Sequence, residues 1–287
     1  MREGKDELDM AATLAFLDRH WKWLVLLAWA GLCAWFLYER WDQLRAFGLG
    51  DTDDNMRMSQ VRALLHGQDW FDLSQHKLVG SNIHWSRLVD LPLAGLILLL
   101  RPVVGGPQAE LAAAALAPLL PYLAMLFGVA LTVRRLVHPA AWALAIVAVF
   151  FAGSTNGMFM PDRIDHHGWQ LALLSLAIAG IADPMRARGG ATLGLASALS
   201  LAIGLELLIY LAITGTAMVL FWIADPGQRR RLMTYAVTLS GGTALSFVLF
   251  ASYANRAAVC DALSPVWLSD ALLGGALLAV IAWLSPG

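Results

Sequence analysis

Two groups of ionisable residues in this chain could do chemistry together. One is the stretch from Asp162 to His167, which contains Asp165-His166-His167, and the other is Asp51-Thr52-Asp53-Asp54 far upstream. Hard carboxylate oxygens suit Mg2+, and an added imidazole moves the preference toward Mn2+. Residues i and i+2 of an extended loop point the same way, so Asp165 and His167 could share one cation, with Asp53 as a third ligand. The residue types therefore predict a divalent-metal site, provided that the two groups lie together.

Helix capping is the alternative interpretation of both groups. Aspartate is a favoured N-cap residue, so Asp165 could do no more than cap a helix that starts at His166. Acidic residues also favour the start of the amphipathic helix predicted after residue 54, whose apolar positions include Met58 and Val61. Capping leaves the two histidines unexplained. Both interpretations stay open at this point.

The composition of the chain is that of a polytopic membrane protein. Of its 287 residues 59% are hydrophobic and 14% are charged, whereas soluble proteins carry about 25% charged residues. A formal net charge of -1 and the lack of a long basic stripe indicate no nucleic-acid partner. The first apolar run, residues 21–38, is long enough to span a bilayer as a signal anchor, behind a cytoplasmic tail of residues 1–20. The expected partner is therefore membrane lipid.

Three short basic connections orient the apolar runs. They are Arg134-Arg135, Arg186 with Arg188, and Arg229 to Arg231, and the positive-inside rule places all three in the cytoplasm. Residues 88–100 then cannot cross, and their uncharged part is also too short for a hydrocarbon core of ~30 Å. We expect a juxtamembrane or re-entrant helix there.

The run of residues 191–224 has cytoplasmic arginines at both ends, so it must form a hairpin that turns near Glu206. The predicted crossings are eight: 21–38, 111–133, 136–153, 167–182, 191–205, 207–223, 233–252 and 271–284. The sequence thus predicts an all-α membrane domain over residues 21–287, with its first outer loop at 39–108, containing juxtamembrane helices, and its second at 154–166. Both ionisable groups fall on the extracytoplasmic side, with the N-terminus inside, as expected for a bacterial or archaeal plasma (inner) membrane protein.

The order of these features resembles the GT-C superfamily of membrane glycosyltransferases, with the closest likeness to catalytic subunits of oligosaccharyltransferases. Asp51-Thr52-Asp53 followed by Arg57 is similar to the family's first motif, and Asp165-His166-His167 is similar to its second. The likeness covers about residues 21–224. Oligosaccharyltransferases continue with further helices, a catalytic Glu in a later outer loop and a soluble domain, so we expect this chain to be the N-terminal part of a longer protein.

The resemblance implies an activity and a set of ligands. It implies that Asp53, Asp165 and His167 bind Mn2+ or Mg2+, and that the substrate is a sugar or oligosaccharide on a polyprenyl phosphate or diphosphate. The metal would stabilise the departing diphosphate. Asp51 is a candidate base or acceptor-orienting residue, beside Asp53. The sugar and its acceptor stay undetermined.

Further polar residues on the outer side are candidate substrate contacts. Guanidinium groups match phosphate in a bidentate manner, although loop arginines at an interface also serve as headgroup anchors. Glu206 is a candidate neighbour of the site, or a simple interfacial carboxylate at the hairpin turn. The candidate substrate-binding residues are Arg57, Arg87, Arg163, Glu206 and Arg256.

A secondary transporter or channel is the alternative function. In it, Glu206, Asp165 and the histidines would form an ion or proton path. Such a path favours ionisable groups near the midplane on broken helices, often with internal repeats. The sequence has no internal repeat, and its ionisable groups are predicted at one surface.

Overall fold

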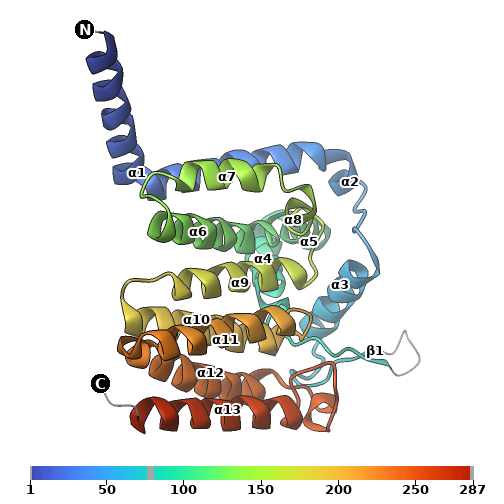
Figure 1. Cartoon of the computed structure of the whole chain (residues 1–287). Helices are drawn as coiled ribbons and strands as arrows, with labels where there is room; N and C mark the ends of the chain where they lie inside the picture. The colour runs from blue at the N-terminus through green and yellow to red at the C-terminus, as the bar shows by residue number, and fades with distance from the viewer. Residues whose placement is uncertain (1, 76–80, 285–287) are drawn as a thin grey trace.

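The computed structural model describes residues 2–75 and 81–284, and this part of the chain is almost entirely helical (Figure 1). Two antiparallel strands of two residues each, β1 (Ser74–Gln75) and β2 (Ser81–Asn82), are its only strands. In chain order the α-helices are α1 (Arg2–Glu39), α2 (Trp41–Arg45), α3 (Thr52–Leu65), α4 (Asp90–Val104), α5 (Gly106–Leu116), α6 (Leu119–Leu136), α7 (Trp142–Phe150), α8 (Gly153–Gly157), α9 (His167–Ile181), α10 (Arg186–Ile203), α11 (Leu208–Ala224), α12 (Arg229–Phe250) and α13 (Pro265–Leu284). Short 3-10 turns lie at Pro226–Gln228 and Ala254–Arg256.

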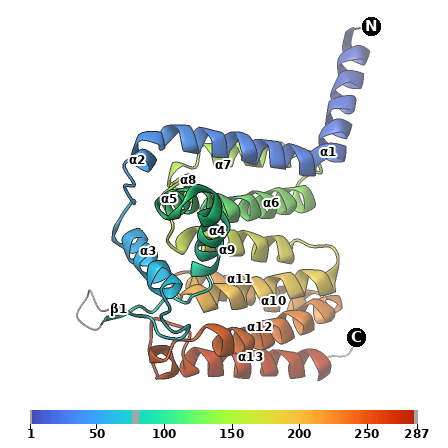
Figure 2. The ribbon, with the colours of Figure 1, turned by 180° about the vertical axis from the view of Figure 1, so that it is seen from behind.

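The long helices lie side by side, and successive ones run in opposite directions (Figures 1 and 2). One apolar core joins α1, α6, α7 and α9 around Phe36, Tyr122 and Phe159. Another joins α9 to α13 around Leu193 and Tyr235. The result is a layered helical bundle with two distinct ends.

One end of the bundle gathers the predicted cytoplasmic arginines. Arg135 Nη2 lies 2.8 Å from the Asp183 carboxylate, and Arg188 Nε lies 2.7 Å from the same group. Arg231 completes the cluster by donating to the backbone oxygens of Ile181 and Asp183. Each of the three basic connections thus supplies one arginine that contacts Asp183, two at its buried carboxylate and Arg231 at its backbone oxygen, as expected if all three lie on one side of a membrane.

Four helices among the described residues are long and apolar enough to cross a membrane. They are Asp9–Glu39, Gly106–Leu136, Pro226–Phe250 and Pro265–Leu284. His167–Ile181 and Leu208–Ala224 are shorter apolar helices. These helices confirm the prediction of an all-α membrane protein. The number of crossings stays a prediction, because α7 covers nine residues where a crossing of residues 136–153 was expected.

The opposite end of the bundle carries the predicted first outer loop. It contains α3, the strand pair and α4, and α4 runs across the direction of the long helices (Figure 2). Helix α4 begins at Asp90 and ends before Gly105, whose φ of 85° stops a helix. A helix thus covers most of residues 88–100, for which a juxtamembrane or re-entrant helix was expected; its place relative to a membrane stays a prediction.

Small residues allow α10 and α12 to approach closely. A Cβ atom added to Gly194 would lie 2.7 Å from the backbone oxygen of Tyr235. Thr234 Oγ1, 3.0 Å from the backbone oxygen of Ala187, forms a hydrogen bond between the same helices. Close contact through small residues is a common way for helices to associate in lipid.

We therefore expect Gly194→Ala to destabilise the bundle by about 1–3 kcal/mol, since the added methyl group overpacks the contact between α10 and α12. The matched control is Gly241→Ala in α12, where an added Cβ meets nothing within 4 Å. The control should leave stability unchanged or raise it by up to about 1 kcal/mol, because alanine favours helix more than glycine does. Thermal unfolding of the two variants in detergent measures the difference. Equal melting temperatures would contradict the close contact.

Candidate functional site

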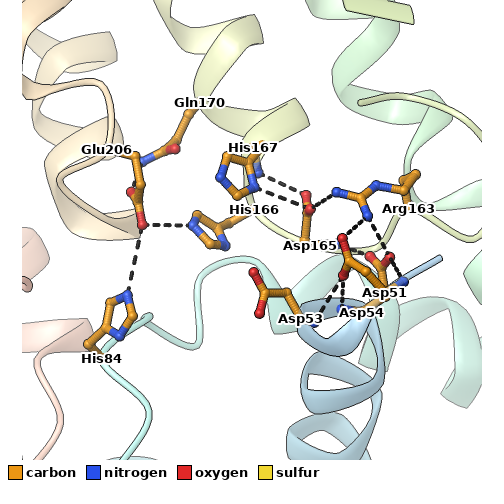
Figure 3. Close-up of polar contacts among 10 residues, drawn as sticks. All are labelled: Asp51, Asp53, Asp54, His84, Arg163, Asp165, His166, His167, Gln170 and Glu206. Atoms are coloured by element: carbon orange, nitrogen blue, oxygen red, sulfur yellow. Dashed lines mark hydrogen bonds and ion pairs between the residues drawn. The ribbon is translucent and has the colours of Figure 1, made fainter. Parts of the chain in front are cut away.

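The two groups of ionisable residues meet at the end of the bundle that carries the predicted first outer loop, which we call the outer end after that prediction (Figure 3). Arg163 Nη1 lies 3.0 Å from Asp54 Oδ2, and the same guanidinium group also pairs with Asp51 and Asp165. The backbone N–H of Asp165 donates to Asp54 Oδ1 at 3.0 Å. Residues more than one hundred positions apart thus form one cluster of three carboxylates around one arginine, which we call the acidic cluster.

The start of α3 places the upstream residues of the acidic cluster. Asp51 is its N-cap, and Asp51 Oδ1 accepts hydrogen bonds from the backbone N–H groups of Asp53 and Asp54 at 2.9 and 3.2 Å. The Asp54 carboxylate accepts in return from the backbone N–H of Asp51 at 3.1 Å. Capping therefore explains Asp51 and Asp54, and it leaves the Asp53 carboxylate free.

An apolar contact brings the second outer loop onto α3. Ile164 is buried in the same core as Met58 and Val61 of α3 and Leu93 of α4. Asp165 follows directly, and its Oδ1 accepts from the backbone N–H of His167 at 3.0 Å at the start of α9. The N-cap of α9 is His166, which makes no side-chain capping hydrogen bond, so the prediction that Asp165 caps a helix starting at His166 is wrong by one residue. The Asp165 carboxylate accepts from the first N–H of the helix and also pairs with Arg163.

The acidic cluster shifts the protonation of its members. Burial raises the pKa of Asp54 to about 7; Arg163 opposes this rise, whereas Asp165 and Asp51 add to it. Burial also acts to raise the pKa of Asp165, but its hydrogen bond with His167 and the charge of Arg163 hold that pKa below the usual range. The three carboxylates therefore differ in pKa. The pKa of Asp54 lies near neutral pH, whereas those of Asp165 and Asp51 lie below the usual range.

A second set of polar contacts centres on Glu206, between the end of α10 and the start of α11. Glu206 Oε1 lies 2.9 Å from His166 Nε2, and its Oε2 accepts from Gln170 Nε2 at 2.7 Å. The Nε2 atom of His84 from the first outer loop lies 3.8 Å from Oε1. Burial would raise the pKa of Glu206, but its hydrogen bonds with His166 and His84 hold that pKa well below the usual range.

Stacked imidazoles join the Glu206 contacts to the acidic cluster. The His166 and His167 rings stack with their centroids 4.5 Å apart, and His167 Nδ1 lies 3.2 Å from Asp165 Oδ2. His166 is 1% exposed at its side chain, whereas His167 is 37% exposed. Of the two histidines, only His167 offers its ring to a ligand.

Asp53 is the open carboxylate of the site. Within residues 2–75 and 81–284 its side chain makes no hydrogen bond or ion pair, and Figure 3 shows it turned away from Arg163, on the side of His166 and Glu206. The side chain is half-buried. Asp53 and His167 are therefore the groups best placed to meet a substrate.

The predicted metal ligands are of residue types that bind divalent cations, but their side chains do not converge on one point. The Asp165 carboxylate is buried and engaged by Arg163 and His167, while Asp53 stands apart from both. Among the described residues, no group of three or more His, Cys, Asp or Glu side chains could hold a metal ion. In this arrangement the cation that neutralises the carboxylates is the guanidinium of Arg163.

The predicted substrate arginines are not equivalent. Arg57 and Arg87 are 0% exposed, and both pair with the buried Asp90, at 2.8 and 3.2 Å. This burial is at odds with a phosphate contact, and it makes both arginines internal partners of α4. Arg256 is exposed and stacks on Phe71, with its Cζ 4.7 Å from the ring centroid; it is not among the residues that pair with the acidic cluster. Of the four, Arg163 alone belongs to the site.

The structure adds residues that the sequence did not single out as site members. Asp54 carries the signature of a capping box with Asp51, so the spacing of the two aspartates was an available signal. His84, His166 and Gln170 converge on Glu206 from distant parts of the chain. No local pattern could have predicted that convergence, since it requires the packing of the outer loop onto α9 and α10.

Comparison of the chain with protein-family models, with curated proteins and with solved structures finds no match. The geometry of the outer end is therefore what supports a function for this chain.

Proposed function

We propose that the chain is a GT-C-type glycosyltransferase domain that moves a sugar or oligosaccharide from a polyprenyl phosphate or diphosphate to an acceptor outside the membrane. The observation that carries the proposal is the contact of Asp51 and Asp54 with Arg163 and Asp165. It joins the two motifs on which the family resemblance rests, at one end of a bundle of apolar helices. A donor with a long isoprenoid chain and a polar head suits a site at that position.

In the proposed transfer, the bond between the sugar C1 and the phosphate oxygen breaks, and a bond from C1 to the acceptor oxygen or nitrogen forms. The electron pair leaves with the phosphate, and the acceptor proton goes to the open carboxylate of Asp53. Such a base is effective only within hydrogen-bond reach of the proton that it takes. His167 and His84, which are 37% and 36% exposed at their side chains, are the N–H donors nearest the open side of the site for the departing phosphate.

The proposal includes the topology of the chain. Eight crossings place the arginine cluster around Asp183 in the cytoplasm and the acidic cluster outside, in a plasma membrane. The separation of the basic and acidic ends of the bundle supports this orientation. The same separation favours glycosyl transfer over the alternative of an ion or proton path, because Glu206 follows the end of α10 and the other ionisable residues gather at that end.

The first test of the proposed function is Asp53→Asn. Purified protein in nanodiscs would be given a panel of radiolabelled sugars on polyprenyl phosphate and diphosphate, and loss of label from the donor would be measured. We expect the wild type to consume at least one donor and the variant to be slower by at least about 100-fold, the usual contribution of a general base. With the residues that the structure describes, Asp53 makes no ion pair that the variant would break, so folding should be unaffected.

Asp42→Asn is the matched control, since Asp42 is an exposed aspartate at the start of α2 on the same side of the bundle. It should retain wild-type consumption of donor. A wild type that consumes no donor, or an Asp53→Asn variant as fast as wild type, would overturn the proposal.

Metal dependence forms a separable part of the proposal. Because Asp53, Asp165 and His167 do not form a ligand set in this arrangement, titration of the protein with Mn2+, followed by electron paramagnetic resonance of the free ion, should show uptake only if a bound donor draws Asp53 toward Asp165; Asp53→Asn and Asp165→Asn would then each weaken it. Uptake that neither variant weakens would exclude the predicted ligand set of Asp53, Asp165 and His167. The transfer assay above does not depend on that result.

A further inference from the structure

A groove with a volume of about 520 Å3 lies between α3, α4 and α5, apart from the acidic cluster. Cavities of this size hold small ligands or a lipid headgroup. Its polar lining includes Arg62 at the far end of α3, Arg101 near the end of α4, and Glu110 in α5. None of the residues of the acidic cluster lines it, so the groove is a separate feature of the outer end.

The groove carries an excess of positive charge. Arg62 Nε and Nη2 both donate to Glu110 Oε2, at 3.0 and 2.6 Å, so one guanidinium is balanced by one carboxylate. Arg101 is exposed, and its side chain makes no hydrogen bond or ion pair with any residue of the described part of the chain. Two guanidinium groups against one carboxylate leave Arg101 available to an anion.

The first turn of α5 adds a second, independent feature that suits an anion. Gly106, Pro107 and Gln108 line the groove, and the start of this helix has no side-chain cap. The uncapped N–H groups of a helix start and the positive end of its dipole attract phosphate. A Cβ atom added to Gly106 would meet nothing within 4 Å, so there is room beside this turn for a bound group.

The remaining walls of the groove are apolar and continue into surface that suits lipid. Phe47, Leu65, Ile97 and Leu111 line it. Beside Arg101, α4 exposes Leu98, Leu99 and Val103, which are 57%, 71% and 82% exposed. A soluble anion would gain nothing from these apolar walls, whereas a phosphate attached to acyl chains can contact both the charged and the apolar residues of the groove.

We propose that this groove is a binding site for an anionic membrane phospholipid of the outer leaflet. The phosphate lies against Arg101 and the first turn of α5, and an acyl chain lies along Phe47, Leu65 and Leu111. This inference goes beyond the proposed function, because it requires no sugar transfer. A lipid bound in this groove would contact the C-terminal end of α4, where Arg101 lies.

The test is a titration of lipid-depleted protein in detergent with phosphatidylglycerol or phosphatidylcholine, with bound lipid counted by native mass spectrometry. We expect phosphatidylglycerol to bind at least about 10-fold more tightly, because phosphatidylcholine carries the same phosphate together with a choline cation, which the positive charge of Arg101 and of the start of α5 disfavours. Arg101→Gln should remove most of that preference. Arg45→Gln, at an exposed arginine of α2 that does not line the groove, should keep it.

Gly106→Asp separates binding from folding. The new carboxylate stands at the start of α5, where it stabilises the helix and repels a lipid phosphate. We expect an unchanged or higher melting temperature together with loss of phosphatidylglycerol binding. Equal binding of the two lipids by the wild type, or undiminished binding by Gly106→Asp, would overturn the proposal. Displacement of the lipid by millimolar inorganic phosphate would overturn the part assigned to the apolar walls.

Discussion

Asp90→Asn is expected to destabilise the protein by about 3–5 kcal/mol, because it leaves two buried guanidinium groups without a counter-charge. Asp90, Arg57 and Arg87 are all 0% exposed at their side chains. A loss of this size is a large part of the 5–15 kcal/mol that ordinarily separates a folded domain from its unfolded state. We expect this to be the most destabilising single substitution of a charged residue in the predicted first outer loop, residues 39–108.

The expected loss extends from α4 to the functional site. Arg87 ties the chain before β1 to α4, since it donates to the backbone oxygen of Asp72 at 2.7 Å and to Gln68 Oε1 at 3.0 Å. Arg57 lies over the ring of Trp85, with its Cζ 4.9 Å from the centroid, and Trp85 packs on His166. Disturbing Asp90 should therefore also release His166 from Glu206.

Thermal unfolding followed by the fluorescence of the 12 tryptophans measures this effect. The matched control is Asp18→Asn, because Asp18 pairs with Arg134 at 2.6 Å but is 50% exposed. A surface pair of that kind contributes about 0–1 kcal/mol, so the control should unfold close to the wild type. If the two variants lost the same stability, Asp90 could not be the only counter-charge that the described residues provide for the two buried arginines.

The sequence could predict the ends of the bundle because arginine placement reports on membrane sidedness without knowledge of packing. Arg135, Arg188 and Arg231 converge on one residue, Asp183, and the acidic and histidine residues lie at the other end. Hydrophobic run length likewise predicted the helical segments. Both signals depend only on residues that are close in the sequence, so they can be used without knowledge of tertiary contacts.

The parts that could not be predicted depend on partners far along the chain. Arg57 resembled a surface phosphate contact because its partner Asp90 lies 33 positions away. Helix α7 is shorter than its apolar run at both ends. Helix α6 continues to Leu136 and α7 begins only at Trp142, and at the other end the side-chain amide of Asn156 donates to the backbone oxygens of Val149 and Phe150 at 3.0 and 2.9 Å. The hydropathy of an apolar run does not reveal that a polar residue beyond it will bind its last backbone oxygens.

Arg163→Gln is expected to weaken the fold by about 3 kcal/mol or more at pH 8, because it leaves neighbouring carboxylates without their common cation. Asp54 and Asp165 are 0% exposed at their side chains, and Asp51 is 43% exposed. Lysine should not replace the arginine fully, since a single ammonium group cannot direct two nitrogens to separate carboxylates as a guanidinium does. Arg163→Lys is thus expected to fall between the wild type and Arg163→Gln.

The deficit of Arg163→Gln should grow as the pH rises from 5 to 8. Burial, opposed by Arg163, sets the pKa of Asp54 at about 7 in the wild type, and removal of the guanidinium raises it further. A carboxyl group whose folded pKa is raised gives stability that is complete below its unfolded pKa of about 3.9 and is lost as the pH rises through the folded pKa. The lowered pKa values of Asp165 and Asp51 give the wild type the opposite contribution, present above about 3.9, and the variant loses it.

Melting temperatures of the wild type and of Arg163→Gln, compared at pH 5 and pH 8, test both the size and the sign of this effect. Arg186→Gln is the control, because Arg186 pairs with Asp225 at 3.2 Å where both side chains are about half exposed, and it should shift stability little at either pH. A deficit of Arg163→Gln that stays constant between pH 5 and pH 8, or that grows toward pH 5, would show that the carboxylates are not held together by Arg163. The joining of the two motifs would then need another cause, and the proposed function would lose the contact that carries it.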